Sequence, residues 1–254
     1  MEQSRLSNTL AEDHDKLILR RRVFDAMKQL EPPQRSVMTL SCVLSADPVD
    51  LRELNEASCH DESLSTKIVT LVNCPIFGLS FPVSTLEQAV MALGAEHLRV
   101  LILSASLLQR IAEDLPVAAQ KIYWRRAFQV AGFSYHLASC SDRCEPSSAY
   151  LAGILHDVGL VPLLMIAENC DLSENRCMFE EDANSIRAQR EEFGIDHLYL
   201  GRLIGMMWGF PAAFIEVFEN HCLPGQNRTV SRFCNIVAAA ASLARLGKTG
   251  GNMQ

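Results

Sequence analysis

Apolar residues recur at helical spacing, rather than in alternation, along almost all of this 254-residue chain. The clearest example is a set whose members are four, four and three residues apart: Leu19, Val23, Met27 and Leu30. Residues at these intervals lie on one face of an α-helix, whereas a half-buried strand requires a period of two. The proline pair at 32–33 then prevents this helix from continuing. The spacing therefore predicts an all-α fold.

The same periodicity continues to the C-terminal region. Leu64, Ile68 and Leu71 predict a helix whose N-cap is Asp61. Hydrophobic residues make up 48% of the chain and charged residues 21%, as in ordinary folded globular proteins. We therefore predict further helices over these ranges: 34–45, 50–58, 86–92, 95–112, 119–140, 147–156, 181–193, 196–207, 212–221 and 230–246.

No low-complexity linker divides the chain, and the clearest boundary lies near 114–118. We interpret the helices on either side as two lobes that share one interface. The expected organisation is an N-terminal mobile segment and helix, the two lobes, and a C-terminal helix with a frayed tail: residues 1–27, about 28–115, about 116–229, and 230–254. Residues 1–15 and 248–254 are expected to be the most mobile.

Charge and hydropathy exclude several classes of partner. The formal net charge is −7, because 30 acidic residues outnumber 23 Lys and Arg, and such a surface repels nucleic acid. The basic clusters at 20–22 and 125–126 are interpreted as solvated helix faces. The N-terminus is polar and acidic, unlike a secretory signal. We predict no apolar stretch approaching about 20 residues, the length that spans a membrane. Together these features favour a cytoplasmic protein that binds neither nucleic acid nor membrane.

The cysteines indicate neither a disulfide framework nor a strong zinc motif. There are nine, an odd number, and no CxxC pair occurs. Cys140 and Cys144 are four residues apart near His136, which is only a weak zinc pattern. We interpret the thiols as buried or idle.

The most informative local string places His156 and Asp157 just before Gly159. An adjacent imidazole and carboxylate at a helix end are able to bind one divalent cation. From spacing alone, a hydrogen-bonded pair in the core is the alternative, and it is favoured. His197 and His221 also lie on inward stripes of later helices, so three histidines would converge either on a metal or as neutral core imidazoles.

Two further groups of residues are predicted to shape the fold. Trp208 closes the stripe that begins at His197, and Pro211 is suited to the first position of the next helix. In the first lobe a turn is expected at 73–78, with three roles. Asn73 would satisfy open carbonyls at the helix end, Phe77 would bury beneath the turn, and Gly78 would supply a positive φ. A second break is expected at Gly94.

These strings resemble those of a known family. AGILHDVGLVPLL, DHLYLGRLIGMMWGFP and NHCLPG are similar, in order and spacing, to the second half of HDOD domains. The region from Asp61 to Lys67, the turn at 73–78, and the segment from Ser84 to Gly94 are similar to the first half. The resemblance covers roughly residues 28–225.

The resemblance implies a two-lobed helical fold related to the HD metal-dependent phosphohydrolases but lacking their activity, as in bacterial signalling proteins. Arg126 stands where active relatives have their first histidine ligand, and Ala241 where they have the last aspartate. A guanidinium group cannot be a metal ligand. We therefore expect no bound metal and no cofactor, and a vestigial site comprising Arg126, His156, Asp157, His197 and His221.

Three functions remain open from the sequence. The favoured one is a non-catalytic regulatory module that binds an unknown signalling protein, with a possible homodimer. Alternatively, Arg126 and the vestigial cleft hold an anionic ligand such as a nucleotide, although an ion pair between Arg126 and Asp157 is the simpler expectation. The least favoured is a phosphohydrolase whose metal is bound by a non-standard set: His156, Asp157, His197 and His221.

Overall fold

The computed structural model describes residues 2–30, 34–141, 144–167, 183–222 and 230–249, and within these ranges the chain is all-α, as predicted. A long helix comes first, α1 (Glu2–Gln29), and it includes the first residues that we expected to be mobile. The first lobe follows, with these elements: α2 (Arg35–Leu44), α3 (Leu51–Cys59), α4 (Glu62–Val72), the 3₁₀ turn η1 (Pro75–Phe77), α5 (Leu86–Leu93) and α6 (Ala95–Asp114).

The second lobe begins directly after Pro116. Its helices are α7 (Val117–Ser139), α8 (Pro146–Leu155), α9 (Leu160–Ile166), α10 (Ala183–Phe193), α11 (His197–Met207) and α12 (Ala212–Asn220), and the C-terminal helix α13 (Arg232–Thr249) follows. Sequence spacing did not predict the short α9 or η1. The tail residues 250–254 lie outside the described residues.

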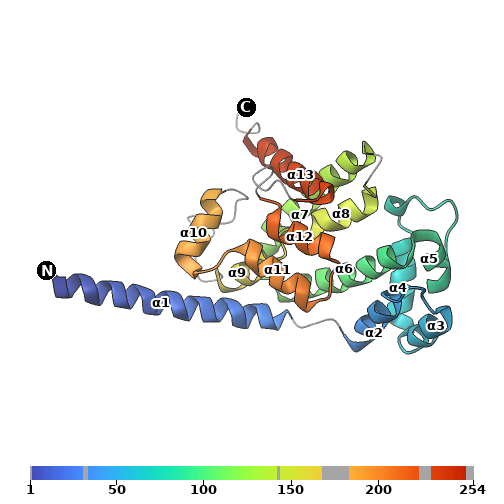
Figure 1. Cartoon of the computed structure of the whole chain (residues 1–254), viewed down its shortest axis with the longest axis horizontal. Helices are drawn as coiled ribbons and strands as arrows, with labels where there is room; N and C mark the ends of the chain where they lie inside the picture. The colour runs from blue at the N-terminus through green and yellow to red at the C-terminus, as the bar shows by residue number, and fades with distance from the viewer. Residues whose placement is uncertain (1, 31–33, 142–143, 168–182, 223–229, 250–254) are drawn as a thin grey trace.

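Helix α6 links the two lobes (Figure 1). It packs on α2 and α5 in the first lobe and on α8 in the second, while α7 packs against both α8 and α13. Helix α1 lies along α9 and α10, so its C-terminal half is fixed to the second lobe. One cluster of buried hydrophobic side chains extends through both lobes, from Val23 in α1 to Ala244 in α13. The lobes therefore share a core.

The first lobe confirms the N-cap expected at Asp61. Its carboxylate accepts hydrogen bonds from the backbone N–H of Leu64, at 2.9 Å, and from the hydroxyl of Ser36, at 3.0 Å. These two bonds favour the ionised form and lower the pKa of Asp61. The cap thus fixes the start of α4 and ties it to α2.

The turn at 73–78 forms, but two of its contacts differ from the prediction. The side-chain amide of Asn73 donates to Val83 O, and its oxygen accepts from Val83 N–H, both at 2.8 Å, so it bridges a ten-residue loop instead of capping helix-end carbonyls. Phe77 is only partly buried, against the ring of His97. Gly78 does have a positive φ, 61°, a region that strains other residues.

The breaks at Gly94 and after Trp208 are also confirmed. Gly94 has a φ of 84° and lies between α5 and α6, which bend by 116°. Trp208 is fully buried, and its indole N–H donates to Leu30 O at 3.4 Å. Pro211 is the N-cap residue immediately before α12, one position earlier than expected.

The prediction about apolar stretches was wrong. Residues 146–166, with a mean hydropathy of 1.8, are long and apolar enough to cross a membrane, and α5 with α6 would pass the same test as a bent pair. However, 83% of the apolar 18-residue window within residues 146–166 is buried inside the protein, as in a core helix. The segment also contains Asp157, whose carboxylate is paired with Arg126 of α7, and His156, whose ring contacts that of His221.

We predict that Asn73→Ala lowers the free energy of unfolding by about 1–3 kcal/mol, because it removes two hydrogen bonds that each contribute roughly 0.5–1.5 kcal/mol. Denaturant melts measure this change. Asn55→Ala is the matched control, since Asn55 is exposed on α3. If Asn73→Ala melts with the same midpoint as the control, the bridge to Val83 does not hold the loop.

Candidate functional site: a buried carboxylate surrounded by an arginine and three histidines

Asp157 lies in the turn between α8 and α9, next to His156, which is the C-cap residue of α8. Both side chains are buried, at 0% exposure for His156 and 2% for Asp157. A carboxylate removed from water is costly unless other groups neutralise it and donate to it. The neighbours of Asp157 therefore decide what this turn does.

Arg126 of α7 is the closest of these neighbours. Its Nη2 lies 2.7 Å from Oδ2 of Asp157, and its side chain is only 5% exposed. This is the ion pair that the sequence analysis favoured over the binding of an anionic ligand by Arg126. One turn before Arg126, Tyr123 is also buried, and its hydroxyl has no hydrogen-bond partner among the described residues. Burial, with the charge of Asp157 adding to it, raises the pKa of Tyr123, so this phenol is neutral.

His156 and His221 face the carboxylate in the same way. In each ring Nδ1 is bonded to a carbonyl oxygen one helical turn earlier, Gly153 O at 2.7 Å and Val217 O at 3.0 Å. A carbonyl only accepts, so Nδ1 carries the proton and Nε2 faces Asp157. The Nε2 of His156 is 3.4 Å from Oδ2, and that of His221 is 3.3 Å from Oδ1.

His197 is the first residue of α11, which begins there because Asp196 caps it by accepting from Tyr199 N–H at 2.9 Å. Gln189 of α10 holds the His197 ring: its side-chain oxygen lies 2.7 Å from Nδ1 and also accepts the backbone N–H of His197. The Nε2 atom is 3.9 Å from Asp157 Oδ1 and 3.3 Å from the sulfur of Cys222.

The geometry thus brings together all five residues that the sequence proposed for the vestigial site, with Asp157 at the centre. It also adds three that the sequence did not single out: Tyr123, Gln189 and Cys222. Cys222 directly follows His221, and adjacency to a candidate ligand was the one sequence signal that pointed to it. No comparable signal marked Gln189, because its role depends on how α10 packs beside α11.

Charges within the site reinforce one another. Burial acts to raise the pKa of Asp157, but the positive charge of Arg126, together with His156 and His221, holds that pKa well below its usual value. For His221, burial acts to lower the pKa. Cys222 and the bond to Asp157 outweigh it and raise the pKa to about 9. The carboxylate is therefore ionised.

The site does not fit the metal arrangement of active HD enzymes, as the resemblance describes it. Oδ2 of Asp157 is bound by the guanidinium of Arg126, which stands where a histidine ligand would be. At the position of the last aspartate, Ala241 is buried and has only a methyl group. Two ligands are thus missing, and a fixed positive charge lies beside a third.

A close helix contact holds this arrangement in place. A Cβ atom added to Gly159 would lie 1.9 Å from His197 O and 2.5 Å from Gly201 N. Only glycine therefore allows the start of α9 to lie directly against α11. The contact keeps Asp157 and His197 within reach of each other.

The other candidates from the sequence do not form sites. Cys140 is exposed and Cys144 half-buried, so these thiols are not core residues. Neither they nor His136 belong to the two groups of metal-binding geometry that the described part of the chain contains. Cys170 and Cys177 lie outside the described residues.

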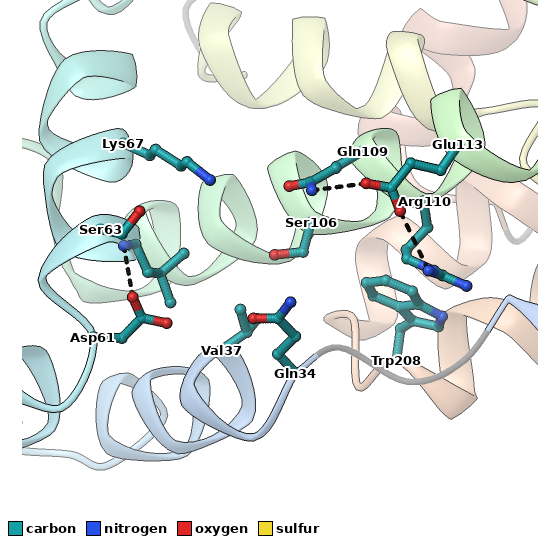
Figure 2. A pocket seen from close by; sticks show the side chains of 11 residues that line it. Gln34, Val37, Asp61, Ser63, Lys67, Ser106, Gln109, Arg110, Glu113 and Trp208 are labelled. Atoms are coloured by element: carbon teal, nitrogen blue, oxygen red, sulfur yellow. Dashed lines mark hydrogen bonds and ion pairs between the residues drawn. The ribbon is translucent and has the colours of Figure 1, made fainter.

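A polar groove of about 430 Å³ lies between α2, α4 and α6, away from Asp157 (Figure 2). Lys67 and Ser106 line it, and Arg110 at one end binds Glu113 and Asp114. Glu113 also accepts from Gln109. Two of the groove's four charged lining residues, Arg110 and Glu113, are thus paired with each other, and none of the four belongs to the Asp157 site.

Comparison with known structures identifies the fold. An HDOD domain protein of unknown function from Geobacter sulfurreducens has a TM-score of 0.65 at 20% identity, covering 92% of this chain and 79% of that one. A protein from Shewanella amazonensis, provisionally named a phosphohydrolase, has a TM-score of 0.62 at 21% identity, with coverage of 90% and 81%. A provisionally named signal transduction protein from Marinobacter aquaeolei has a TM-score of 0.56 at 18% identity, with coverage of 93% and 56%.

Among curated proteins, an uncharacterized protein of Treponema pallidum is 22% identical over 182 residues, which are 68% of this chain. The chain spans only about a third, 34%, of that relative's length. The HDOD domain family model matches residues 30–224, close to the region over which the sequence resemblance was drawn. The resemblance is thereby confirmed, and this chain belongs to the HDOD domain family.

Proposed function

We propose that this protein is a non-catalytic regulatory module of a bacterial signalling system, which works in the cytoplasm by binding a protein partner. The observation that carries this proposal is the ion pair between Arg126 and Asp157, because it fills the place where an active relative would hold a metal. The name of the Marinobacter neighbour supports a role in signal transduction. Self-association as a homodimer remains part of the proposal.

Burial argues against the two other functions. Water activation by a metal requires an open coordination position that substrate can reach, yet His156, Asp157 and His221 are at most 2% exposed. An anionic ligand would need the guanidinium of Arg126, which is 4% exposed and already bound to Asp157. The names of the Shewanella neighbours favour hydrolysis, and that alternative is tested directly.

We expect the purified protein to hydrolyse neither phosphomonoesters nor phosphodiesters above the background of buffer in the presence of Mn²⁺. His156→Ala, which would remove a ligand from any metal-dependent site, should give the same result as the wild type. Release of phosphate and of nucleotide product is the measurement. Turnover that is present in the wild type and lost in His156→Ala would overturn the non-catalytic proposal.

The ion pair should be structural. Asp157→Ala leaves the guanidinium of Arg126 buried and unpaired, so we expect a loss of about 3–5 kcal/mol in the free energy of unfolding. Replacing both residues with apolar ones of similar size, as in Arg126→Met with Asp157→Leu, should recover most of that loss. Chelator in the buffer removes any contribution from metal ions.

The control is the exposed pair of Lys28 with Asp25, 3.3 Å apart on α1. Asp25→Ala should change the free energy of unfolding by no more than about 0.5 kcal/mol. If Asp157→Ala costs no more than this control, or if the double variant is less stable than the single one, the ion pair does not support the fold.

Binding to a protein partner is tested by cross-linking in the native organism. The wild type and His156→Ala should recover the same partner, because the proposed binding uses the folded surface and not the chemistry of the site. An unrelated helical domain with the same tag is the control. Recovery of only those proteins that the control also recovers would contradict the proposal.

A further inference from the structure

The polar groove between α2, α4 and α6 collects hydrogen-bond donors that the protein itself does not use. Gln34, Ser63, Lys67 and Ser106 line it, and their side chains make no hydrogen bond or ion pair with any residue that the structure describes. Figure 2 shows Lys67 on α4, Ser106 on α6 and Gln34 before α2 directed into the space between them. Solvated side chains on a flat surface point apart, whereas these converge from separate elements.

The two acidic residues in the groove are already engaged. The carboxylate of Asp61 caps α4 and accepts a hydroxyl from α2, as described above. Glu113 is paired with Arg110 at 3.3 Å and accepts from the amide of Gln109 at 2.9 Å. Lys67 is the remaining charged lining residue, and its charge acts on Asp61 only through space, where it helps to lower the carboxyl pKa. One positive charge is therefore left facing the groove.

Two helices begin at this groove and add to that positive charge. The N-cap residue of α2, Gln34, makes no side-chain bond to the first turn, and Val37 in that turn lines the groove. Ser63 lies in the first turn of α4 and lines it from the other side. The free N–H groups at a helix N-terminus carry partial positive charge, which favours anions. Both helix ends thus act in the same direction as Lys67.

The groove has the size and the position of a small-molecule site. Its volume is about 430 Å³, and sites for small molecules measure roughly 300–1,000 Å³. Trp208, which is fully buried, contributes to its wall from the end of α11 in the second lobe. The other lining residues belong to the first lobe and to α6. A molecule bound here would therefore contact both lobes.

We propose that this groove binds a small molecule through a phosphate group. Lys67 supplies the balancing charge, as lysines commonly do for phosphate, and Ser63, Ser106 and Gln34 donate hydrogen bonds to its oxygens. Inorganic phosphate and the phosphate of a sugar phosphate present the same chemistry to these groups. The amide oxygen of Gln109 is able to accept a hydroxyl from the rest of a sugar phosphate.

This site goes beyond the proposed function and is separate from the Asp157 site. It includes neither Arg126 nor any of the histidines around Asp157. It therefore differs from the anionic ligand that the sequence analysis placed in the vestigial cleft, where burial argues against binding. A ligand that touches both lobes would give the regulatory module a chemical input.

Titration calorimetry of the full chain tests the site, in phosphate-free buffer at constant ionic strength. The probes are ribose 5-phosphate, inorganic phosphate and ribose. Both phosphate compounds should bind and raise the melting temperature, because a ligand that binds only the folded state stabilises it. Ribose should do neither. Tighter binding of ribose 5-phosphate than of phosphate would assign the groove to a sugar phosphate, and equal affinities would assign it to free phosphate.

Variants locate the binding. Lys67→Met should weaken the binding of ribose 5-phosphate by about 10- to 100-fold, because it removes a charge-assisted hydrogen bond. Ser106→Ala, which removes one neutral donor, should weaken it by about 3- to 10-fold. The matched control is Lys121→Met, since Lys121 is an exposed lysine on α7 that does not line the groove, and it should bind like the wild type. Lys67 is exposed too, so its variant should melt like the unliganded wild type.

Three results would each overturn the proposal. They are no binding of either phosphate compound to the folded wild type, equal affinities for ribose and ribose 5-phosphate, and equal affinities of Lys67→Met and Lys121→Met for ribose 5-phosphate. None of them bears on the proposed function. Failure to bind phosphate leaves the non-catalytic proposal standing, and turnover that is lost in His156→Ala would refute that proposal while leaving the groove intact.

Discussion

The buried ion pair between Arg126 and Asp157 is the constraint on which the second lobe depends. Both charges are almost fully removed from water, and at 2.7 Å each is the main compensation for the other. The cost of desolvation does not disappear, so the pair is no proof of extra stability. The pair does fix the relative position of α7 and the α8–α9 turn. If Arg126 and Asp157 were separated, each would leave the other as an unpaired buried charge.

The histidines extend this constraint to other helices. His197 reaches Asp157 from α11, His221 from the end of α12, and Gln189 connects α10 through His197. One carboxylate is thus the common neighbour of side chains from several helices that are far apart in sequence. This convergence defines how the helices of the lobe sit on one another.

Local features of the fold followed from the sequence, and features that depend on tertiary contacts did not. The apolar stripes predicted the ends of the longer helices to within a few residues. Asp61 caps the helix that follows it directly, and Gly78 adopts a positive φ, so both roles depend only on residues close by in the sequence. Helix α9 has only seven residues inside a continuous apolar stretch, so no periodicity distinguished it. Asn73 bonds a residue ten positions away, and Phe77 is only partly buried, with its ring against that of His97, twenty positions further along the chain.

The same distinction applies to the site. Helical stripes indicated that His197 and His221 face inward, but an inward direction does not say which atoms meet. The sequence predicts that the thiols are buried or idle, and Cys222 is buried, but no spacing indicates which side chain its sulfur contacts. Its contact with His197 exists only because α11 and α12 pack side by side.

The contact at Gly159 has a consequence for reading related sequences. Because the carbonyl of His197 occupies the space where a Cβ would be, a relative with any other residue at this position must separate the α8–α9 turn from α11. That separation would carry the aspartate away from the histidine. The identity of this single residue therefore sorts homologues into those that are able to build a joined polar centre and those in which its two halves have come apart.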